Sequence, residues 1–228
     1  YTYGDKYMKK TLRMGDLLHL DNSVKKRLVT MVDSKNLVME GSYNAAPISV
    51  DEMWAWLEKY AAIFKDYICD VGQYLADADA AGKKVLFEAQ LGSLRDLDYG
   101  IYPYTTSSNA IAAYAPVGSG LPTAKLGEVV GVVKAYSSCV GEGPFTCEWF
   151  GPEAEELREA GDEYGAKTGR PRRVGPIDLV ASRYGIRMQG ATEIALTKLD
   201  VLSYLDKIPV CAHYELNGQQ IDYFPFPA

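Results

Sequence analysis

Apolar residues recur at helical spacing through the first third of the chain. Asn22 and Ser23 suit the start of a helix, and the apolar positions that follow fall on one face: Val24, Leu28, Met31 and Val32. Residues 43–48, which include Pro47, predict a loop. Residues 49–52 (SVDE) then form a capping-box pattern, in which the serine hydroxyl accepts a hydrogen bond from the amide three residues on. Apolar residues keep helical spacing from Leu57 to Leu75, which predicts one helix that ends near Ala80 with one side buried.

Beyond residue 82 the pattern changes to short apolar runs that alternate with helical segments. It predicts strands at residues 84–87, 131–138 and 193–196, and helices at residues 126–130, 152–160 and 176–189. Residues 92–120 and the basic stretch 165–175 read as loops, and Asn217-Gly218 between two apolar runs predicts a hairpin. This alternation is typical of an α/β fold with a mostly parallel sheet and flanking helices. We therefore expect a mainly helical segment at residues 1–82 and an α/β core at residues 83–228.

The composition narrows the class of protein. Acidic residues (30) outnumber basic ones (24), and the formal net charge of −6 argues against bulk binding to nucleic acid or to an anionic membrane. No apolar run reaches the length that spans a membrane. The four cysteines form no C-x-x-C pair and have no histidine at zinc-motif spacing, so reduced, mostly buried thiols in a cytoplasmic protein are expected. His19 and His213 stand alone on apolar segments, where packing is the expected role.

The basic loop at residues 168–173 (TGRPRR) is the first candidate for chemistry. Its three guanidinium groups, from Arg170, Arg172 and Arg173, repel one another unless an anion lies between them. Arginine pairs with carboxylate and phosphate through two parallel hydrogen bonds, so an anionic ligand is one interpretation. A solvated basic turn, balanced by the acidic helix at residues 153–163, is an equally good one.

A second candidate, residues 197–200 (TKLD), follows directly after the predicted strand at residues 193–196. The Asp200 carboxylate can accept from both the ring N–H and the exocyclic amine of guanine, and the stem of Lys198 can lie over the purine face. Ligands of open α/β sheets lie at the carboxyl ends of strands, where this segment falls. The alternative is a simple helix start. Residues 161–168 (GDEYGAKT) lack the spacing of a phosphate loop.

Four stretches of sequence together resemble one family. They are residues 85–121 (VLFEAQLGSLRDLDYGIYPYTTSSNAIAAYAPVGSGL), 134–145 (KAYSSCVGEGPF), 161–173 (GDEYGAKTGRPRR) and 196–202 (LTKLDVL). In this order and at this nearly gapless spacing, they resemble adenylosuccinate synthetase. The resemblance covers almost the whole chain and implies an incomplete P-loop-NTPase-like α/β fold. It also implies that GTP and Mg²⁺ support the joining of IMP to L-aspartate, by phosphorylation of the IMP 6-oxygen and displacement of that phosphate by the aspartate amine.

The resemblance assigns roles to particular residues. The residues expected to contact IMP are Lys9, Leu91, Thr106, Val140 and Arg170. The loop expected to bind aspartate consists of Ala166, Lys167, Thr168, Gly169, Arg170 and Arg172. The residues expected to contact GTP are Arg172, Lys198, Leu199 and Asp200. Lys9 lies in residues 9–13 (KKTLR), which resemble the family's R-R-G-L-R, and is expected to reach the IMP phosphate of the partner subunit in a homodimer. No metal ligand is expected within the chain.

Three positions depart from the family pattern. The family phrase F-E-G-A-Q-G, whose glutamine bonds the IMP base, reads FEAQLG at residues 87–92. In strict register Leu91 takes the glutamine position and Gln90, the catalytic candidate, stands one place early. Extended backbone would point Gln90 to the other side, and a local bulge would restore it. Cys139 replaces an arginine and removes one charge, and Pro171 replaces an arginine in the aspartate loop.

The resemblance also implies what the chain does alone. The family's phosphate loop, its aspartate base and its histidine acid correspond to sequence before Tyr1, and a further guanine-contacting segment to sequence after Ala228. We therefore expect the 228-residue chain to bind ligands weakly and to turn over nothing by itself. The alternative is a short relative that binds a purine nucleotide without catalysis.

Overall fold

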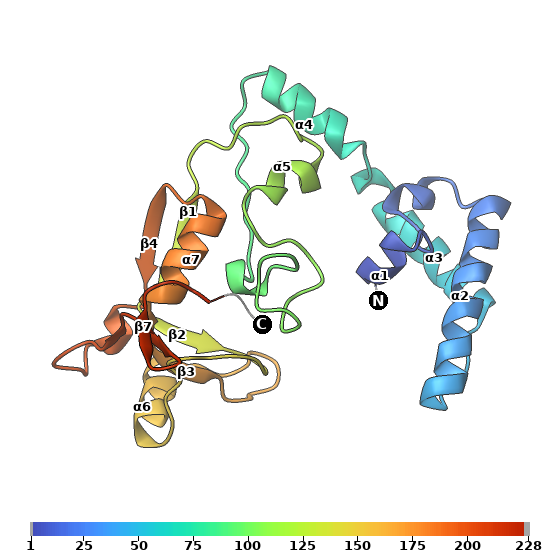
Figure 1. The fold of residues 1–228 in the computed structure, drawn as a ribbon. Coiled ribbons are helices and arrows are strands. Elements are labelled where there is room, and N and C mark those ends of the chain that lie inside the picture. The colour runs from blue at the N-terminus through green and yellow to red at the C-terminus, as the bar shows by residue number, and fades with distance from the viewer. Residues whose placement is uncertain (1, 226–228) are drawn as a thin grey trace. The chain divides into compact units, whose positions relative to one another are not determined.

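The computed structural model describes residues 2–225, which fall into two compact units at residues 1–83 and 84–228. We call them the N-terminal unit and the C-terminal unit. The N-terminal unit is helical, and the C-terminal unit combines short strands with helices (Figure 1). Within the described residues, no helix is both long and apolar enough to cross a membrane.

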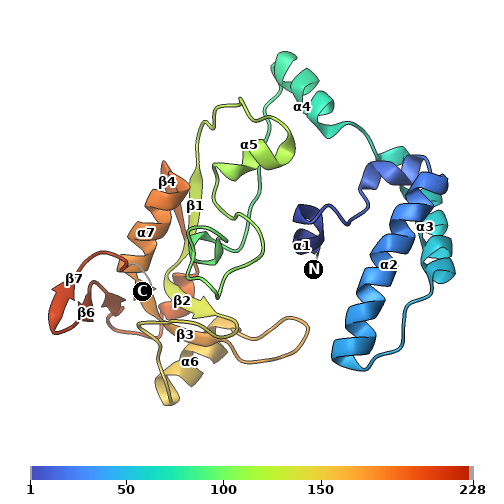
Figure 2. The ribbon, with the colours of Figure 1, turned by 45° about the vertical axis from the view of Figure 1, so that its right-hand side comes forward.

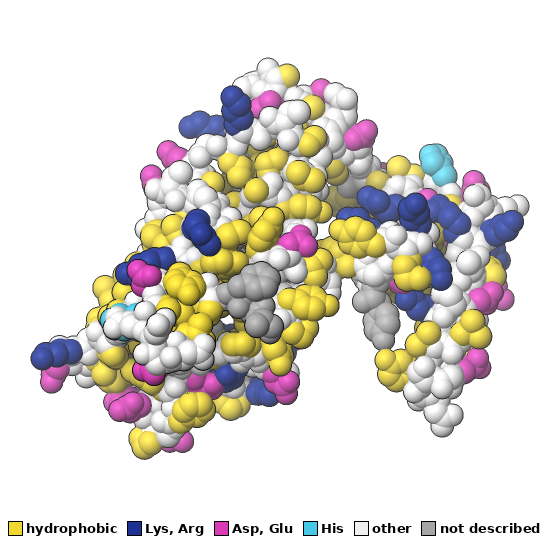
Figure 3. Space-filling view, in the orientation of Figure 1, with side chains coloured by type: hydrophobic (Ala, Val, Ile, Leu, Met, Phe, Trp, Pro, Cys, Tyr) yellow, Lys and Arg dark blue, Asp and Glu magenta, His cyan; other side chains and the backbone are white. Residues whose placement is uncertain are grey.

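The N-terminal unit packs two long helices on each other. Its elements are α1 (Thr2–Tyr7), η1 (Met14–Leu18), α2 (Asn22–Tyr43), α3 (Val50–Phe64), η2 (Lys65–Tyr67) and α4 (Val71–Ala80). Leu28 and Val32 of α2 are buried with Leu57 of α3, and this cluster forms the core of the unit. Figure 3 shows Lys and Arg side chains gathered on the visible face of this unit.

The helix caps explain both a success and two errors of the sequence predictions. Ser49 caps α3 as predicted, because its Oγ accepts from the Glu52 amide at 3.3 Å. The cap of α2 is Asp21, which accepts from the amides of Ser23 and Val24, and not Asn22 or Ser23. The single helix predicted to reach Ala80 is wrong, since α3 ends at Phe64 and Asp70 caps a separate helix, α4.

The C-terminal unit is an α/β structure, as predicted, built on three small sheets. Its elements are η3 (Ser93–Arg95), α5 (Tyr114–Ser119), β1 (Val130–Lys134), β2 (Tyr136–Cys139), α6 (Pro152–Gly161), β3 (Arg173–Asp178), α7 (Leu179–Gln189), β4 (Glu193–Thr197), η4 (Asp200–Leu202), β5 (Val210–Cys211), β6 (Tyr214–Leu216) and β7 (Gln219–Ile221). β1 pairs with β4 in parallel, and β3 pairs with β5 in parallel and with β2 antiparallel. Figures 1 and 2 both show α7 beside β1 and β4.

Local sequence signals placed some of these elements correctly. The helix expected at residues 152–160 is α6, which has Pro152 at its first position and ends at Gly161. The strand expected at residues 193–196 is β4. The hairpin is formed by β6 and β7, with Asn217 and Gly218 both at positive φ in the turn. Two residues at positive φ are what a two-residue hairpin turn requires.

Four other predictions for this unit are wrong. Residues 84–87 are coil without a paired strand among the described residues, and Leu86 is 92% exposed. Residues 126–129 are not helical, and β1 begins at Val130. The strand expected at residues 131–138 is two strands, β1 and β2, which enter different sheets on either side of Ala135. The last helix begins at Leu179 and not at Pro176, since β3 continues to Asp178, whose carboxylate caps α7.

A buried cluster and a set of polar contacts fix the loops of this unit. Tyr136 of β2, Leu157 of α6 and Val174 of β3 belong to the core cluster, each at most 2% exposed. Beside it, the amide of Gln189 on α7 donates to Ser93 Oγ and Ala110 O and accepts from the Ala112 amide. Helix α7 therefore holds the long loop between η3 and α5 at both of its ends.

Candidate functional site

An open cavity of about 510 Å³ lies between the loop after η3 and strand β2. Its lining consists of Leu91, Arg95, Tyr104, Thr105, Thr106, Ser138, Cys139, Val140 and Glu142. Three of the residues expected to contact IMP, namely Leu91, Thr106 and Val140, therefore meet at one place although they lie far apart in the sequence. The lining also offers the phenol of Tyr104, three aliphatic hydroxyl groups, from Thr105, Thr106 and Ser138, and one guanidinium, from Arg95.

Backbone contacts set the shape of this cavity. The Thr106 amide donates to the Arg95 carbonyl at 2.8 Å, and the Leu97 amide donates to the Ser108 carbonyl at 3.2 Å, so the two sides of the loop are joined. Gly143 packs against the ring of Tyr104 and has a φ of +114°; a Cβ there would lie 2.8 Å from the ring. That residue must be glycine for Tyr104 to keep its place in the wall.

Leu91 and Gln90 occupy different environments. Leu91 lines the cavity and has a φ of 79°, so the backbone there is not extended. Gln90 is exposed and lies outside the cavity lining. Of the two residues that compete for the family's glutamine position, the structure therefore puts the leucine at the cavity.

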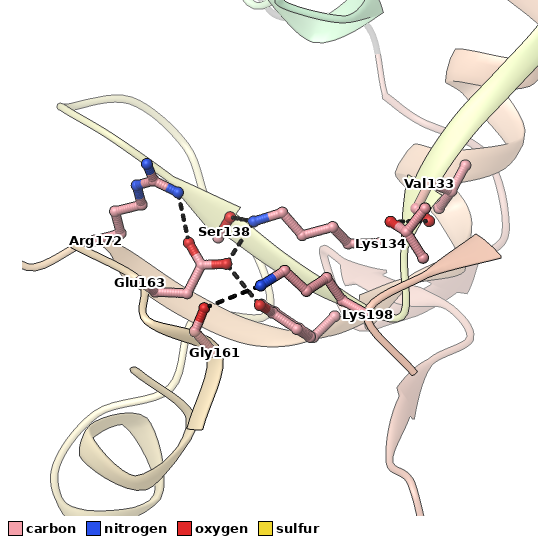
Figure 4. Close-up of polar contacts among 9 residues, drawn as sticks. Val133, Lys134, Ser138, Gly161, Glu163, Arg172 and Lys198 are labelled. Atoms are coloured by element: carbon pink, nitrogen blue, oxygen red, sulfur yellow. Dashed lines mark hydrogen bonds and ion pairs between the residues drawn. The ribbon is translucent and has the colours of Figure 1, made fainter. Parts of the chain in front are cut away.

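A buried charged centre lies next to the cavity, around the carboxylate of Glu163 (Figure 4). Glu163 is 1% exposed. Its Oε1 accepts from Lys134 Nζ and from the Tyr136 hydroxyl, both at 2.6 Å, and its Oε2 accepts from Arg172 Nη1 at 2.8 Å. Lys134 Nζ also donates to Ser138 Oγ, a hydroxyl of the cavity wall. The charged centre and the cavity thus share Ser138.

Electrostatics keep the charged centre ionised. Burial by itself raises the pKa of Glu163, but the hydrogen bonds from Lys134, Tyr136 and Arg172 outweigh burial and lower it to about 2. Burial and the neighbouring carboxylate together raise the pKa of Tyr136, so this phenol stays a donor. The packing is close, since a Cβ on Gly161 would lie 2.6 Å from the Tyr136 hydroxyl oxygen.

The basic loop divides into paired and unpaired arginines. Arg172 bonds Glu163, and Arg173 bonds both carboxylate oxygens of Glu148. The balanced-charge interpretation therefore holds for these two residues, although Glu148 lies outside the acidic helix. Arg170 is exposed, and its guanidinium has no partner among the described residues of its unit.

The rest of the predicted aspartate loop is a tight, exposed turn. The Gly165 amide donates to the Arg170 carbonyl at 2.9 Å, and the Gly169 amide donates back to the Gly165 carbonyl at 2.7 Å. Ala166, Lys167, Thr168 and Gly169 are all exposed between these bonds. The loop therefore presents its side chains to solvent from a fixed base.

The segment expected to contact guanine lies at the carboxyl end of the parallel pair β1–β4, where Lys134 pairs with Thr197. Lys198 has a φ of 60° and its Nζ donates to the Gly161 carbonyl at 3.4 Å, so this side chain points toward the charged centre (Figure 4). Leu199 is half exposed, and Asp200 opens η4 with an exposed side chain. Lys9, the remaining candidate, is exposed in the N-terminal unit just after α1.

Among the described residues, one group of three metal-ligating side chains lies close together: Cys147, Asp178 and Cys211, whose ligand atoms lie within 4.8 Å of one another. This group does not suit magnesium. Mg²⁺ prefers six oxygen ligands, and two thiols do not provide them. Burial, reinforced by Asp178, also raises the pKa of Cys147 to about 12, so this thiol is protonated.

Sequence reasoning missed Glu163, Lys134, Tyr136 and Arg95. The first three meet only because β1, β2 and the segment just after α6 come together in the fold, and no spacing in the sequence signals that. Arg95 could have been singled out from the sequence, because it is the one basic residue in residues 85–121. Its position in the cavity lining could not be read from that stretch.

Comparison with known proteins places these features in a family. The family model described as adenylosuccinate synthetase matches residues 1–228. The chain is similar to the fully ligated adenylosuccinate synthetase of Plasmodium falciparum, with 33% sequence identity, a TM-score of 0.88, and coverage of 99% of this chain and 52% of that one. It also matches the succinoaminodeoxyadenylate synthetase of cyanophage S-2L, with 23% identity, a TM-score of 0.43, and coverage of 64% of this chain and 47% of that one. This chain thus spans about half the length of either protein. Because the family model matches residues 1–228 and the Plasmodium protein is 33% identical over 99% of this chain, the chain belongs to the adenylosuccinate synthetase family.

Proposed function

We propose that the C-terminal unit forms the nucleotide- and aspartate-binding part of a GTP-dependent ligase that joins IMP to L-aspartate. Family membership supports the reaction. One structural observation carries the site: Leu91, Thr106 and Val140 line the same cavity as Arg95. A pocket with three hydroxyl groups and a guanidinium has the donors that a phosphate group accepts.

The individual roles are those that the family resemblance implies, and the chemistry of each segment is consistent with them. Thr106 donates its hydroxyl to the IMP phosphate, and the backbone at Val140 faces the ribose. Thr168 and the unpaired Arg170 bind the carboxylates of aspartate, since an exposed guanidinium suits a dicarboxylate. Arg172 lies toward GTP, and the Asp200 carboxylate selects guanine by accepting from its ring N–H and its amine. Lys198 and Leu199 complete this guanine-binding segment.

We also propose that the family's homodimer includes this chain, with Lys9 directed at the IMP phosphate of the partner subunit. Lys9 supports this role by its exposure and its positive charge. Lysine keeps the charge of the family's arginine but not its two-pronged geometry. Light scattering of the purified chain would test the assembly. A monomer at every concentration up to about 1 mM, with or without IMP, would contradict it.

A second candidate is a relative that binds a purine nucleotide without catalysis. The observation that favours it is the position of Leu91, an apolar residue at the cavity where the family has a glutamine, while Gln90 lies outside. Phosphate release from GTP in the presence of IMP and aspartate tests for catalysis. We expect no release by the 228-residue chain alone. Release would contradict that inactivity and would also exclude a non-catalytic protein.

Ligand-induced stabilisation tests the binding function. IMP at about 100 times its dissociation constant should stabilise the chain by roughly 2.7 kcal/mol and raise its melting temperature. Thr106→Val should weaken this effect, because it removes a hydroxyl in the cavity and keeps the branched shape of the side chain. The matched control is Thr30→Val on α2, which removes an exposed hydroxyl in the other unit. If neither IMP nor GTP changes the melting temperature of the wild-type chain, the nucleotide-binding function is wrong.

A further inference from the structure

Arg95 is the one cation in the cavity lining, and the family resemblance gives it no role. We propose that Arg95 binds the phosphate group of the nucleotide, in place of the positive charge that the family has at position 139. The inference rests on the proposed function, because it takes a purine nucleotide as the ligand of this cavity.

The Arg95 side chain crosses from the loop to strand β2. Arg95 is the last residue of η3, and its Nη1 donates to the Tyr104 carbonyl while its Nη2 donates to Cys139 Sγ at 2.6 Å. Cys139 is the residue that stands where the family has an arginine. The guanidinium of Arg95 therefore lies against the side chain of residue 139, so it brings a positive charge from the opposite wall to the position from which the family's arginine extends.

Arg95 differs from the other arginines nearby in lacking a carboxylate partner. Arg172 is neutralised by Glu163 and Arg173 by Glu148. Among the described residues of its unit, Arg95 bonds only a carbonyl and a thiol. Glu142, the one acid of the cavity lining, is exposed and makes no ion pair with it. A guanidinium has five N–H donors, so several remain for an anion, and none of its charge is cancelled internally.

The backbone of Arg95 is fixed before any ligand arrives. Its neighbour Ser93 is buried, donates to the Gly185 carbonyl of α7 and accepts from Gln189. On the other side, Asp96 is fully buried, and its carboxylate accepts from the amides of Asp98, Tyr99 and Ala110. The carbonyl of Arg95 itself accepts from the Thr106 amide, so the backbones from which the guanidinium and the Thr106 hydroxyl extend are held together. Such pre-organisation lowers the entropic cost of binding.

Phosphate is the chemical group that these features fit. A fork of two parallel N–H groups matches two phosphate oxygens, and the hydroxyls of Thr105, Thr106 and Ser138 can donate to the others. The phosphate could belong to a nucleoside monophosphate or be inorganic phosphate. The experiment therefore compares IMP, inosine and inorganic phosphate as ligands of the 228-residue chain.

The test measures dissociation constants by ligand-observed NMR. Arg95→Leu should weaken IMP binding by about 10- to 100-fold, the cost of losing hydrogen bonds to a charged group, and should leave inosine binding unchanged. Arg95→Lys should give an intermediate loss, since it keeps the charge and loses the fork. Arg183→Leu, which removes an exposed arginine of α7, is the matched control and should leave IMP binding unchanged.

A rescue variant separates binding from a structural role. Adding Cys139→Arg to Arg95→Leu should recover most of the IMP affinity, because the new side chain extends from the position that the Arg95 guanidinium contacts and restores a positive charge to the cavity. A residue that only shaped the loop would not be rescued in this way. The proposal is overturned if Arg95→Leu binds IMP as the wild type does, or if it loses IMP and inosine equally.

The remaining outcomes concern the ligand. If the wild-type chain binds inorganic phosphate as tightly as IMP, and Arg95→Leu loses both, the nucleotide assignment is overturned and a free-phosphate site remains. If the wild type binds neither IMP nor inosine, the proposed function fails before Arg95 is tested. A loss of IMP binding confined to Arg95→Leu, with rescue by Cys139→Arg, supports the proposal.

Discussion

The charged centre around Glu163 and the cavity beside it share strand β2, but they differ in whether their cations have a carboxylate partner. In the charged centre, Lys134 and Arg172 both bond one buried carboxylate, so each of these cations has an anionic partner within the fold. In the cavity, Arg95 has a carbonyl and a thiol as partners and no carboxylate among the described residues of its unit. The difference indicates where a ligand should bind: cations that support the fold are paired with a carboxylate within it, and a cation without such a partner in an open cavity can be paired by an anion that binds there.

The largest effect should come from removing the charge of the buried carboxylate. Glu163→Gln keeps the size of the side chain but leaves Lys134 and Arg172 without their anion. Breaking a buried ion pair in this way costs about 3 kcal/mol or more of the free energy of unfolding. Urea denaturation at pH 7 measures it, with Glu156→Gln on the exposed side of α6 as the control. A loss no larger than that of the control would show that the centre is not a structural support.

The pH dependence of stability should report the same carboxylate. The pKa of Glu163 falls from 4.5 to about 2 in the folded chain, so its contribution is complete above about pH 4.5 and is lost as the pH falls toward 2. Between pH 6 and pH 3 the wild-type chain should lose about 2 kcal/mol more stability than Glu163→Gln, which has no carboxyl group to protonate. Urea denaturation of both chains at the two pH values tests this. Parallel pH profiles for the two chains would refute the lowered pKa.

The two regions also differ in how far the sequence could predict them. Thr106 and Val140 could be proposed as site residues because the family resemblance assigns each of them a contact with IMP, and the structure brings them to one cavity. Glu163 also lies in a stretch that resembles the family, but the resemblance assigned it no role, and it was interpreted only as part of an acidic helix that balances the basic loop. Its actual role depends on Lys134, Tyr136 and Arg172, which come from three separate segments, and no local pattern contains that convergence.

The secondary-structure elements differ in the same way: some have causes within a few residues and could be predicted, and others depend on distant residues. Helix α6 and the β6–β7 hairpin were predicted because proline, glycine and Asn-Gly signals act within a few residues. The prediction of a strand at residues 84–87 was wrong because a strand needs a partner strand, and an apolar run does not reveal whether one exists. The break between α3 and α4 was missed although its cause is local, since Asp70 is a capping residue that the helical spacing concealed.

A smaller effect should follow from removing one hydrogen bond of the charged centre while its charges stay. Tyr136→Phe deletes the hydroxyl that donates to Glu163 and leaves the Lys134 and Arg172 bonds in place. A hydrogen bond to a charged group contributes about 1.5–3 kcal/mol, and the bonds that remain should hold the loss near the lower value. Thermal denaturation measures the change, and Tyr164→Phe, which removes a phenol bonded to exposed Glu159, is the control. Equal losses in the two variants would mean that burial adds nothing to the Tyr136 bond.

The smallest effect on stability should come from the cavity itself. Thr106 is only half buried, and its hydroxyl makes one long contact, 3.4 Å to Ser108 Oγ. Thr106→Val keeps the branched shape, and the free energy of unfolding should change by no more than about 0.5 kcal/mol, as for most surface substitutions. Urea denaturation measures this, and the same sample should show weakened IMP binding if the proposed function holds. The comparison between the two regions requires this separation, because a cavity kept open for a ligand should affect binding far more than stability. A loss above 1 kcal/mol without ligand would place Thr106 with Glu163 among the supports of the fold.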